Sequence, residues 1–291
     1  DLAGFEGLSD SGQLDLTELG LTDPLSMRVR VGRNLEKFAL PGAMTKEDRI
    51  RFEKTMLAAF DKLKANPDYG GCVYSLTRNA DWKEVTGEDA NPNLITDEKY
   101  HELVKAHVMF KDMAADPYLA SAGIASHWPC GRGCYQSEDK QFIIWFGEED
   151  HLRIMCMKKG TVLNEVFDRL RSALELVDGL PDLKFAHSDQ YGYVTSCPTN
   201  IGTGMRASLH IKMPKLTADG QKDPHGNSPR CKNIAKPLGL SVRGLGGEHT
   251  PIGADGTVDI SPSARFCITE AQIITALYLG IKQMADAEAN M

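Results

Sequence analysis

Apolar and polar positions alternate in several short stretches of the chain, which is the pattern of β-strands. In the stretch Ser-Met-Arg-Val-Arg-Val at 26–31, the alternation places Arg28 and Arg30 on one face of a predicted strand. Residues 142–146 and 152–157 predict two more strands, and because only five residues separate them, an antiparallel hairpin is the simplest connection. Further strands are predicted at 72–76, 191–196, 206–213 and 240–245.

Other stretches carry apolar residues at the spacing of one helix face. Thr45 precedes such a stretch and is a plausible helix start, because apolar residues then recur from 52 to 63. Strands and helices mix without a regular βαβ alternation, which predicts an α+β fold with a largely antiparallel β-sheet flanked by helices. Further helices are predicted at 97–115, 163–177 and 269–284, and loops at 78–96, 217–230 and 246–256.

Length and composition describe an ordinary globular protein. The 291 residues suffice for one large domain or two small ones, and 42% hydrophobic with 25% charged residues excludes wholesale disorder. No apolar run approaches the roughly 20 residues that a membrane-spanning helix needs, so no span is predicted. The net charge of −7 argues against a dedicated nucleic-acid binder, and an anionic ligand would therefore need a local basic site.

The cysteines and histidines favour no metal site. The seven cysteines include no Cys-x-x-Cys pair, and the eight histidines show no zinc-ligand spacing. Reduced thiols in a cytosol-like compartment are the default expectation, which predicts a cytoplasmic protein. An organelle or a cytoskeletal association stays open.

Five arginines lie in or at the ends of predicted strands. A single such arginine usually faces solvent or forms a salt bridge. Five of them in an acidic protein favour a polyphosphate ligand, because a guanidinium group matches phosphate oxygens with two parallel donors. The five are Arg28, Arg30, Arg153, Arg206 and Arg243.

Three loop segments carry further candidate chemistry. Gly-Glu-Glu-Asp-His at 147–151 lies between the hairpin strands and is either an exposed acidic turn or a carboxylate placed as a general base or cation holder. Cys-Pro-Thr-Asn-Ile-Gly-Thr-Gly at 197–204 is either a structural loop or part of a site, but no Walker A loop, because its spacing of glycine and lysine differs. The glycine-rich stretch 243–250 is either a surface turn or a mobile loop that carries Glu248 to a ligand.

Taken together, these segments resemble the phosphagen (guanidino) kinases, the family of arginine kinase and creatine kinase. The resemblance extends from Ser26 to Ala285, and the strings at 148–153 and 197–203 are its most specific parts. It rests on Ser-x-Arg-Val-Arg-x-Gly-Arg at 26–33, Trp-Pro-x-Gly-Arg-Gly at 128–133, Glu-Glu-Asp-His-Leu-Arg at 148–153, Cys-Pro-Thr-Asn-x-Gly-Thr at 197–203 and Arg-Gly-x-Gly-Gly at 243–247.

The resemblance implies a reaction and a fold. The family transfers the γ-phosphoryl group of MgATP reversibly to a guanidino nitrogen, on a catalytic domain similar to the glutamine synthetase core. The expected partners are therefore ATP or ADP, Mg²⁺ held by the nucleotide phosphates and by water, and a small guanidino substrate. No protein ligand for the metal is expected.

The resemblance also implies roles for individual residues. Glu149 matches the catalytic carboxylate that binds the guanidino group, Cys197 matches the cysteine beside that group, and Thr199 matches its hydrogen-bonding neighbour. Trp145 lies four residues before Glu149, as the active-site tryptophan of the family does. The positions that match the nucleotide site are Ser26, Arg28, Arg30, His107 on the adenine side, Arg153, Arg206 and Arg243.

The matched positions favour L-arginine as the phosphoryl acceptor. Glu248, in Gly-Glu-His-Thr, matches the second guanidinium-binding carboxylate of arginine kinases, where creatine kinases carry an apolar residue. Thr199 is also the arginine-kinase choice, where creatine kinases typically have Ser. Taurocyamine, lombricine, glycocyamine and creatine stay open as acceptors. A protein-arginine kinase and a catalytically silent scaffold protein stay open as alternative functions.

The chain departs from the family pattern in length and at one motif position. The N-terminal helical domain of the family is absent from this sequence, so 1–25 is predicted to be a linker or arm and 26–291 the catalytic domain. The missing domain, or a larger assembly, is a candidate partner. Gly147 replaces the usual Asn before Glu148, and the loops at 78–96 and 217–232 have no assigned role.

Overall fold

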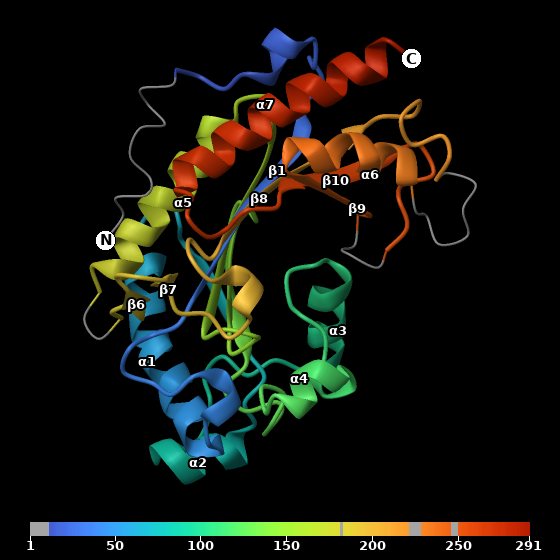
Figure 1. Ribbon diagram of the computed structural model, residues 1–291. Coiled ribbons are helices and arrows are strands. Elements are labelled where there is room, and N and C mark those ends of the chain that lie inside the picture. The colour runs from blue at the N-terminus through green and yellow to red at the C-terminus, as the bar shows by residue number, and fades with distance from the viewer. Residues whose placement is uncertain (1–11, 181–182, 221–227, 246–249) are drawn as a thin grey trace. The chain divides into compact units, whose positions relative to one another are not determined.

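The computed structural model describes residues 12–180, 183–220, 228–245 and 250–291. These residues form two compact units (Figure 1). Unit 1 comprises Asp1–Arg30, Cys156–Arg171 and Met205–Met291, and unit 2 comprises Val31–Met155 and Ser172–Gly204. Strands β1 (Leu25–Arg33) and β5 (Leu152–Gly160) and helix α5 (Leu163–Asp178) each contribute residues to both units.

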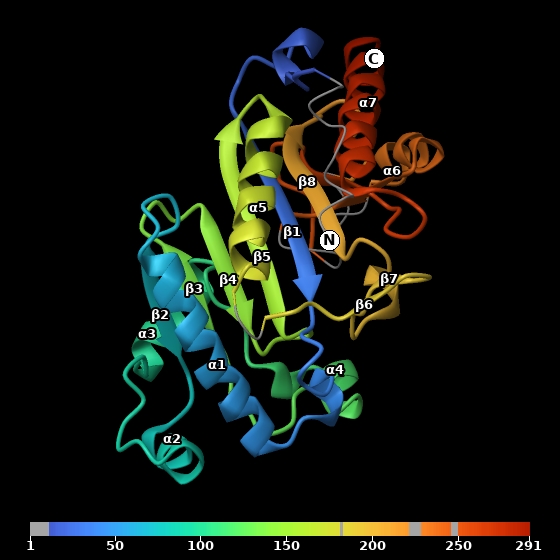
Figure 2. The ribbon, with the colours of Figure 1, turned by 90° about the vertical axis from the view of Figure 1, so that its left-hand side faces the viewer.

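Unit 2 is built on a sheet in which the strands follow the order β2-β3-β4-β5. Strands β2 (Gly71–Ser75), β3 (Gly133–Ser137) and β4 (Phe142–Phe146) pair antiparallel. Helix α1 (Lys46–Lys64) begins where Thr45 and Asp48 form a reciprocal capping box, and Figure 2 shows it running across these strands. The ring of Phe60 on this helix stacks on Tyr135 at 5.3 Å, so the apolar face of α1 covers the sheet.

Unit 2 also contains the elements for which the sequence-based prediction was least accurate. The segment 78–96, predicted as a loop, contains helix α2 (Asn79–Thr86), which buries Trp82. The helix predicted at 97–115 ends at Lys105, because His107 adopts a left-handed φ of 58° and the amide of Val108 turns back to the Leu103 carbonyl. The remaining short elements are η4 (Pro41–Ala43), η5 (Met113–Ala115), α4 (Pro117–Ser121), β6 (His187–Ser188), β7 (Gly192–Tyr193) and η6 (Pro198–Asn200).

Unit 1 has a sheet with the strand order β1-β8-β10-β9. Strand β10 (Thr257–Pro262) pairs antiparallel with both β8 (Met205–Lys212) and β9 (Leu240–Arg243). Helix α7 (Glu270–Ala289) packs on β8 and β10, and the shorter α6 (Pro229–Ala235) packs on β9 and leads into η7 (Lys236–Leu238). The apolar side chains of these strands are buried, which leaves polar side chains for the opposite face.

The predicted fold class is confirmed, because the pairings between strands β2, β3 and β4 and between β8, β9 and β10 are antiparallel and helices flank the sheet. Strands β3 and β10 were not predicted from the sequence, and the strand predicted at 191–196 shrinks to the two residues of β7. Within the predicted arm, η3 (Leu16–Leu19) buries Leu16, whose amide donates to the Thr161 carbonyl at 2.8 Å. None of the described helices is long and apolar enough to cross a bilayer.

Candidate active site

The acidic turn at 147–151 is held by its backbone. The Gly147 amide donates to the His151 carbonyl at 2.9 Å, which closes the turn between β4 and β5. Gly147 has a φ of +72°, and a Cβ at this position would overlap the carbonyl oxygen of Gly131. The glycine thus satisfies both a left-handed backbone and a close approach that a side chain would prevent.

Arg132 supports the same turn from the buried side. Its five N–H groups have five backbone carbonyl acceptors, and the Nε group donates to Gly147 at 3.1 Å. The other acceptors are the carbonyls of Ile124, Ser126, His127 and Cys130. Burial lowers the pKa of Arg132 to about 9, whereas the complete set of acceptors matches its protonated form.

Asn34 and Asp150 connect this turn to the loop that carries the candidate cysteine. The Asn34 side chain accepts from the His151 amide and donates to Asp150 Oδ1, each at 2.8 Å. The same Asp150 oxygen accepts from the Ser196 amide at 2.6 Å. Asp150, which directly follows Glu149, therefore holds Ser196, the residue before Cys197, through its carboxylate.

Glu149 is the predicted catalytic carboxylate and lies at the centre of this arrangement. Burial raises its pKa, as do the charges of Glu148 and Asp150, whereas Arg153 and a hydrogen bond from Cys197 lower it. Arg153 Nη2 lies 2.8 Å from Glu148 Oε2 and 3.4 Å from Glu149 Oε2. A half-buried carboxylate with a raised pKa suits a group that binds a cation and takes up a proton.

Trp145 and the cysteine loop complete the carboxylate site. The guanidinium of Arg153 lies over the Trp145 ring at 5.2 Å, and the indole N–H donates to the Val108 carbonyl at 2.6 Å. In the cysteine loop, the Sγ of Cys197 lies 3.0 Å from the Thr199 hydroxyl, at the start of η6. The structure thus brings together five of the sequence-predicted residues, namely Trp145, Glu149, Arg153, Cys197 and Thr199.

A second cluster lies on the polar face of the unit 1 sheet. On β10, Asp259 lies directly opposite His210 of β8 and Arg243 of β9, so these three side chains share a face of the sheet. Arg206 joins them, because its guanidinium donates to Asp259 at 2.5 Å and to the Ser261 hydroxyl at 3.1 Å. Burial raises the pKa of Asp259, but hydrogen bonds from His210 and the charge of Arg206 lower it more, so the net shift is downward.

Arg265 belongs to this cluster although it was not predicted from the sequence. Burial, and after it the positive charges of Arg206 and Arg243, lower the pKa of Arg265 to about 10, so the three guanidinium groups interact electrostatically. Arg265 was missed because it follows β10 in a loop, whereas the predicted arginines all belong to strands. Strand β10 was not predicted either, so no sequence pattern pointed to Arg265.

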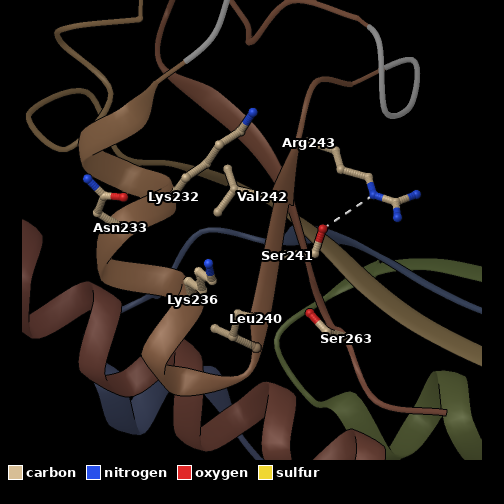
Figure 3. Close-up of a pocket in the computed structure, with 8 residues that line it drawn as sticks. All are labelled: Lys232, Asn233, Lys236, Leu240, Ser241, Val242, Arg243 and Ser263. Carbon is tan, nitrogen blue, oxygen red and sulfur yellow. Dashed lines mark hydrogen bonds between the residues drawn. The ribbon is translucent and has the colours of Figure 1, made fainter.

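A pocket of about 310 Å³ adjoins Arg243 at β9 (Figure 3). Ser241 and Arg243 project to one side of the strand and share a hydrogen bond of 3.4 Å, whereas Val242 projects toward Lys232 on α6. Lys236 adds a further cation to the lining.

The other predicted nucleotide residues are divided between the two units. Ser26, Arg28 and Arg30 are half-buried on β1 in unit 1, where they alternate with buried apolar residues. His107 is exposed after α3 (Asp97–Lys105) in unit 2. Glu248 lies outside the described residues. Within the described residues no group of three or more His, Cys, Asp or Glu side chains could hold a metal ion.

Comparison with known proteins gives the family of the chain. The family model of the ATP:guanido phosphotransferase C-terminal catalytic domain matches residues 73–291. The chain belongs to this family. This ATP:guanido phosphotransferase therefore transfers phosphoryl groups between ATP and a guanidino compound.

Several relatives of this ATP:guanido phosphotransferase have known names or structures. It is 35% identical to arginine kinase Oct f 2 of Amphioctopus fangsiao over 97% of the chain and 74% of the relative. The substrate-free duplicated taurocyamine kinase from Schistosoma mansoni matches with a TM-score of 0.78 and 33% identity, over 98% of this chain and 36% of that one. Lombricine kinase matches with a TM-score of 0.75 and 28% identity, over 95% and 70% of the two chains.

Proposed function

We propose that this phosphotransferase is an arginine kinase, which transfers the γ-phosphoryl group of MgATP reversibly to a guanidino nitrogen of L-arginine. The observation that carries the proposal is Glu149, whose carboxylate has a raised pKa and lies beside Cys197 and Arg153. A guanidinium group is protonated at neutral pH, so it must lose a proton as it attacks phosphorus. Glu149 would orient the planar guanidinium and accept that proton.

The arginines would supply the electrostatic part of the reaction. Phosphoryl transfer spreads negative charge over the equatorial oxygens, and catalysis consists mainly of positioning and of stabilising that charge. Arg206, Arg243 and Arg265 form a cationic cluster, and the mutual repulsion that lowers the pKa of Arg265 would be relieved by a polyphosphate. Further nucleotide-binding residues are each proposed from the motif position that they match, namely Ser26, Arg28, Arg30, Arg153 and His107.

The proposed Mg²⁺ enters with the nucleotide. It would be held by phosphate oxygens and water, as is usual for an ion that loses its hydration shell reluctantly. Its charge would neutralise part of the polyphosphate when it is bound. This role is compatible with an arginine cluster that binds oxygens directly and with a carboxylate pair that is occupied by Arg153.

The choice of arginine as acceptor depends on two positions. Thr199 lies next to Cys197 through the 3.0 Å contact, and Glu248 would provide the second carboxylate to a planar guanidinium. Two carboxylates suit a guanidinium whose substituents leave both edges available. Relatives named arginine, taurocyamine and lombricine kinase match this chain at similar identity, so the acceptor must be measured.

The decisive experiment is a coupled assay of ADP release from MgATP. L-Arginine, taurocyamine, lombricine, glycocyamine, creatine and an arginine-containing protein are compared with no acceptor, for the wild-type chain and for Glu149→Gln. Glu149→Gln keeps the shape of the side chain but removes its charge, so turnover should fall by about 10²–10⁴-fold if the carboxylate accepts the proton. Glu102→Gln, at an exposed glutamate in unit 2, is the matched control and should keep full activity.

The outcomes separate the candidate functions. Arginine-dependent turnover that is lost in Glu149→Gln supports the arginine kinase proposal. Faster turnover with another guanidine keeps the chemistry and changes the substrate, and phosphorylation of protein arginine alone would indicate a protein-arginine kinase. Binding of MgADP without turnover on any acceptor would contradict the enzyme proposal for this chain and favour a structural role.

A further inference from the structure

A buried carboxylate outside the site just described occupies the centre of a hydrogen-bond network in unit 2. Glu53 lies on α1 and is fully buried. Its Oε1 accepts from the Ser75 hydroxyl, and its Oε2 accepts from the Thr77 hydroxyl at 2.5 Å. The Asn91 amide group lies 3.3 Å from Oε1 and also donates to the Ser75 hydroxyl at 2.7 Å. Three segments of chain thus converge on one carboxylate.

The hydrogens of this network fit an ionised Glu53. Each hydroxyl gives its single hydrogen to the carboxylate, and each receives another hydrogen from an amide. The Ser75 hydroxyl accepts from the Thr77 amide at 3.1 Å, and the Thr77 hydroxyl accepts from the Gly131 amide at 2.7 Å. A protonated Glu53 would turn its own O–H toward a hydroxyl that already donates to it, so one of these two hydrogens would lose its acceptor.

Burial opposes the charged form that the network favours. It raises the pKa of Glu53 to about 7, although hydrogen bonds from Ser75, Thr77, Asn91 and the Gly131 backbone lower it. A buried charge of this kind is weak evidence for stability, because apolar residues of similar volume often replace such groups without loss. The presence of Glu53 therefore calls for a role beyond packing.

The network ends at the backbone that supports the acidic turn. Gly131 packs directly on α1, where a Cβ would meet the Arg49 backbone oxygen at 2.5 Å. Its own carbonyl oxygen lies where a Cβ of Gly147 would be. The next residue, Arg132, donates to the Gly147 carbonyl. A short path of contacts thus runs from the Glu53 carboxylate through Thr77 and Gly131 to the residue that precedes Glu148 and Glu149.

We propose that Glu53 is a positioning residue for the phosphoryl transfer. It holds the turn that carries Glu148 and Glu149 in position through the Thr77 hydroxyl and the Gly131 amide. The inference rests on the proposed function, because it assigns Glu149 the catalytic role. It also gives the segment 78–96 a function, since Asn91 holds both Ser75 and the Thr77 carbonyl. Glu53 touches no substrate and acts through Gly131 and Gly147.

The test compares variants at Thr77, where the network can be cut without a change in charge. Thr77→Val removes the hydroxyl and keeps the shape, whereas Thr77→Ser restores the hydroxyl. Thr55→Val, at a half-buried threonine of α1 whose hydroxyl donates to the Arg51 carbonyl, is the control. A misplacement of about 1 Å can cost 10²-fold in rate, so kcat should fall by about 10- to 100-fold in Thr77→Val. The KM for MgATP should change little, and Thr77→Ser should recover the rate.

A second measurement does not depend on turnover. Amide hydrogen exchange of the full chain reports the protection of segments 130–133 and 147–151. Both should exchange faster in Thr77→Val than in wild type, while the 147–151 segment keeps its protection in Thr55→Val. Glu53→Gln is the second variant, should Thr77→Val fail to fold, and is expected to give the same loss of kcat and of protection.

The two proposals fail in different ways. One result for Thr77→Val is faster exchange at 130–133 while either the exchange at 147–151 or kcat stays at the wild-type value. That result would overturn the positioning role of Glu53 and leave the kinase proposal intact. If wild type turns over no guanidine, the kinase proposal fails, and unchanged protection of 147–151 in both variants would then overturn the structural link as well. Loss of kcat in Thr55→Val equal to that in Thr77→Val would also contradict the inference.

Discussion

Gly147 offers a sharp test of how the catalytic turn is held. It combines a φ of +72° with direct contact to the Gly131 carbonyl, whereas Gly87 has a φ of +76° with nothing within 4 Å of the position that a Cβ would take. Replacing each by Ala therefore imposes the same backbone strain but a steric overlap at only one site. The difference between the two variants isolates the cost of the close approach.

The expected magnitudes follow from these two environments. A left-handed backbone costs a residue with a Cβ about 1–2 kcal/mol, and the less flexible unfolded chain offsets about 0.4–1 kcal/mol of this, so Gly87→Ala should lose about 1 kcal/mol of unfolding free energy. Overpacking typically adds about 1–3 kcal/mol, so Gly147→Ala should lose about 2–4 kcal/mol. Its kcat should fall as well, because relief of the overlap must move the turn that carries Glu149.

Urea unfolding followed by tryptophan fluorescence measures both variants. The three tryptophans of the chain, Trp82, Trp128 and Trp145, all belong to unit 2, so the signal reports the unit that contains both glycines. Initial rates with MgATP and the best guanidine complete the comparison. Equal destabilisation of the two variants, or a Gly147→Ala enzyme with wild-type kcat, would refute the argument that close packing at Gly147 positions the turn.

Two further predictions concern a buried histidine and the arginine cluster. Burial lowers the pKa of His151 to about 4. Between pH 6.5 and 4 the unfolded chain therefore binds a proton that the folded chain does not. As the pH drops through that range, the unfolding free energy should fall by up to about 3 kcal/mol. His151→Gln should flatten this slope in urea unfolding at pH 4–7, and an unchanged slope would contradict a neutral buried imidazole. Arg265→Ala should weaken MgADP binding about tenfold or more, measured by calorimetry, because a charge-assisted contact is lost. Arg265→Lys should show an intermediate affinity, and the control Arg51→Ala, at an exposed arginine, should bind MgADP as wild type does. Equal affinities of wild type and Arg265→Ala would remove Arg265 from the nucleotide site.

Local patterns predicted the elements that position the carboxylate site. The apolar strands β4 and β5 are separated by too few residues for any connection but a tight turn, so the turn at 147–151 was correctly placed. Helix α1 was likewise evident from Thr45 and its apolar spacing. Strand β3 was missed because Gly-Cys-Tyr-Gln-Ser is too short and too mixed to show an alternation, and it is stabilised by pairing with β2 and β4.

Relations between distant segments were beyond the reach of sequence patterns. Helix α2 was not predicted because it lies in a polar stretch, and its one buried residue, Trp82, cannot show an apolar periodicity. Glu53 looks like any helical glutamate in sequence, and only the tertiary structure brings Ser75 and Asn91 to it. The grouping of Arg265 with Arg206 and Arg243 depends in the same way on the pairing of β8, β9 and β10.

The five backbone carbonyls that accept from Arg132 limit how this site can be redesigned or moved to another protein. The segment 124–130 and the catalytic turn share a single side chain, so neither can be exchanged as an independent module. A grafted loop would have to present its carbonyls at the same positions, and lysine could not substitute, because its point charge lacks the planar array of five donors. Insertions should accordingly be tolerated in the exposed residues after Ser137 and rejected between Ile124 and Arg132, even though most of that segment lacks regular secondary structure.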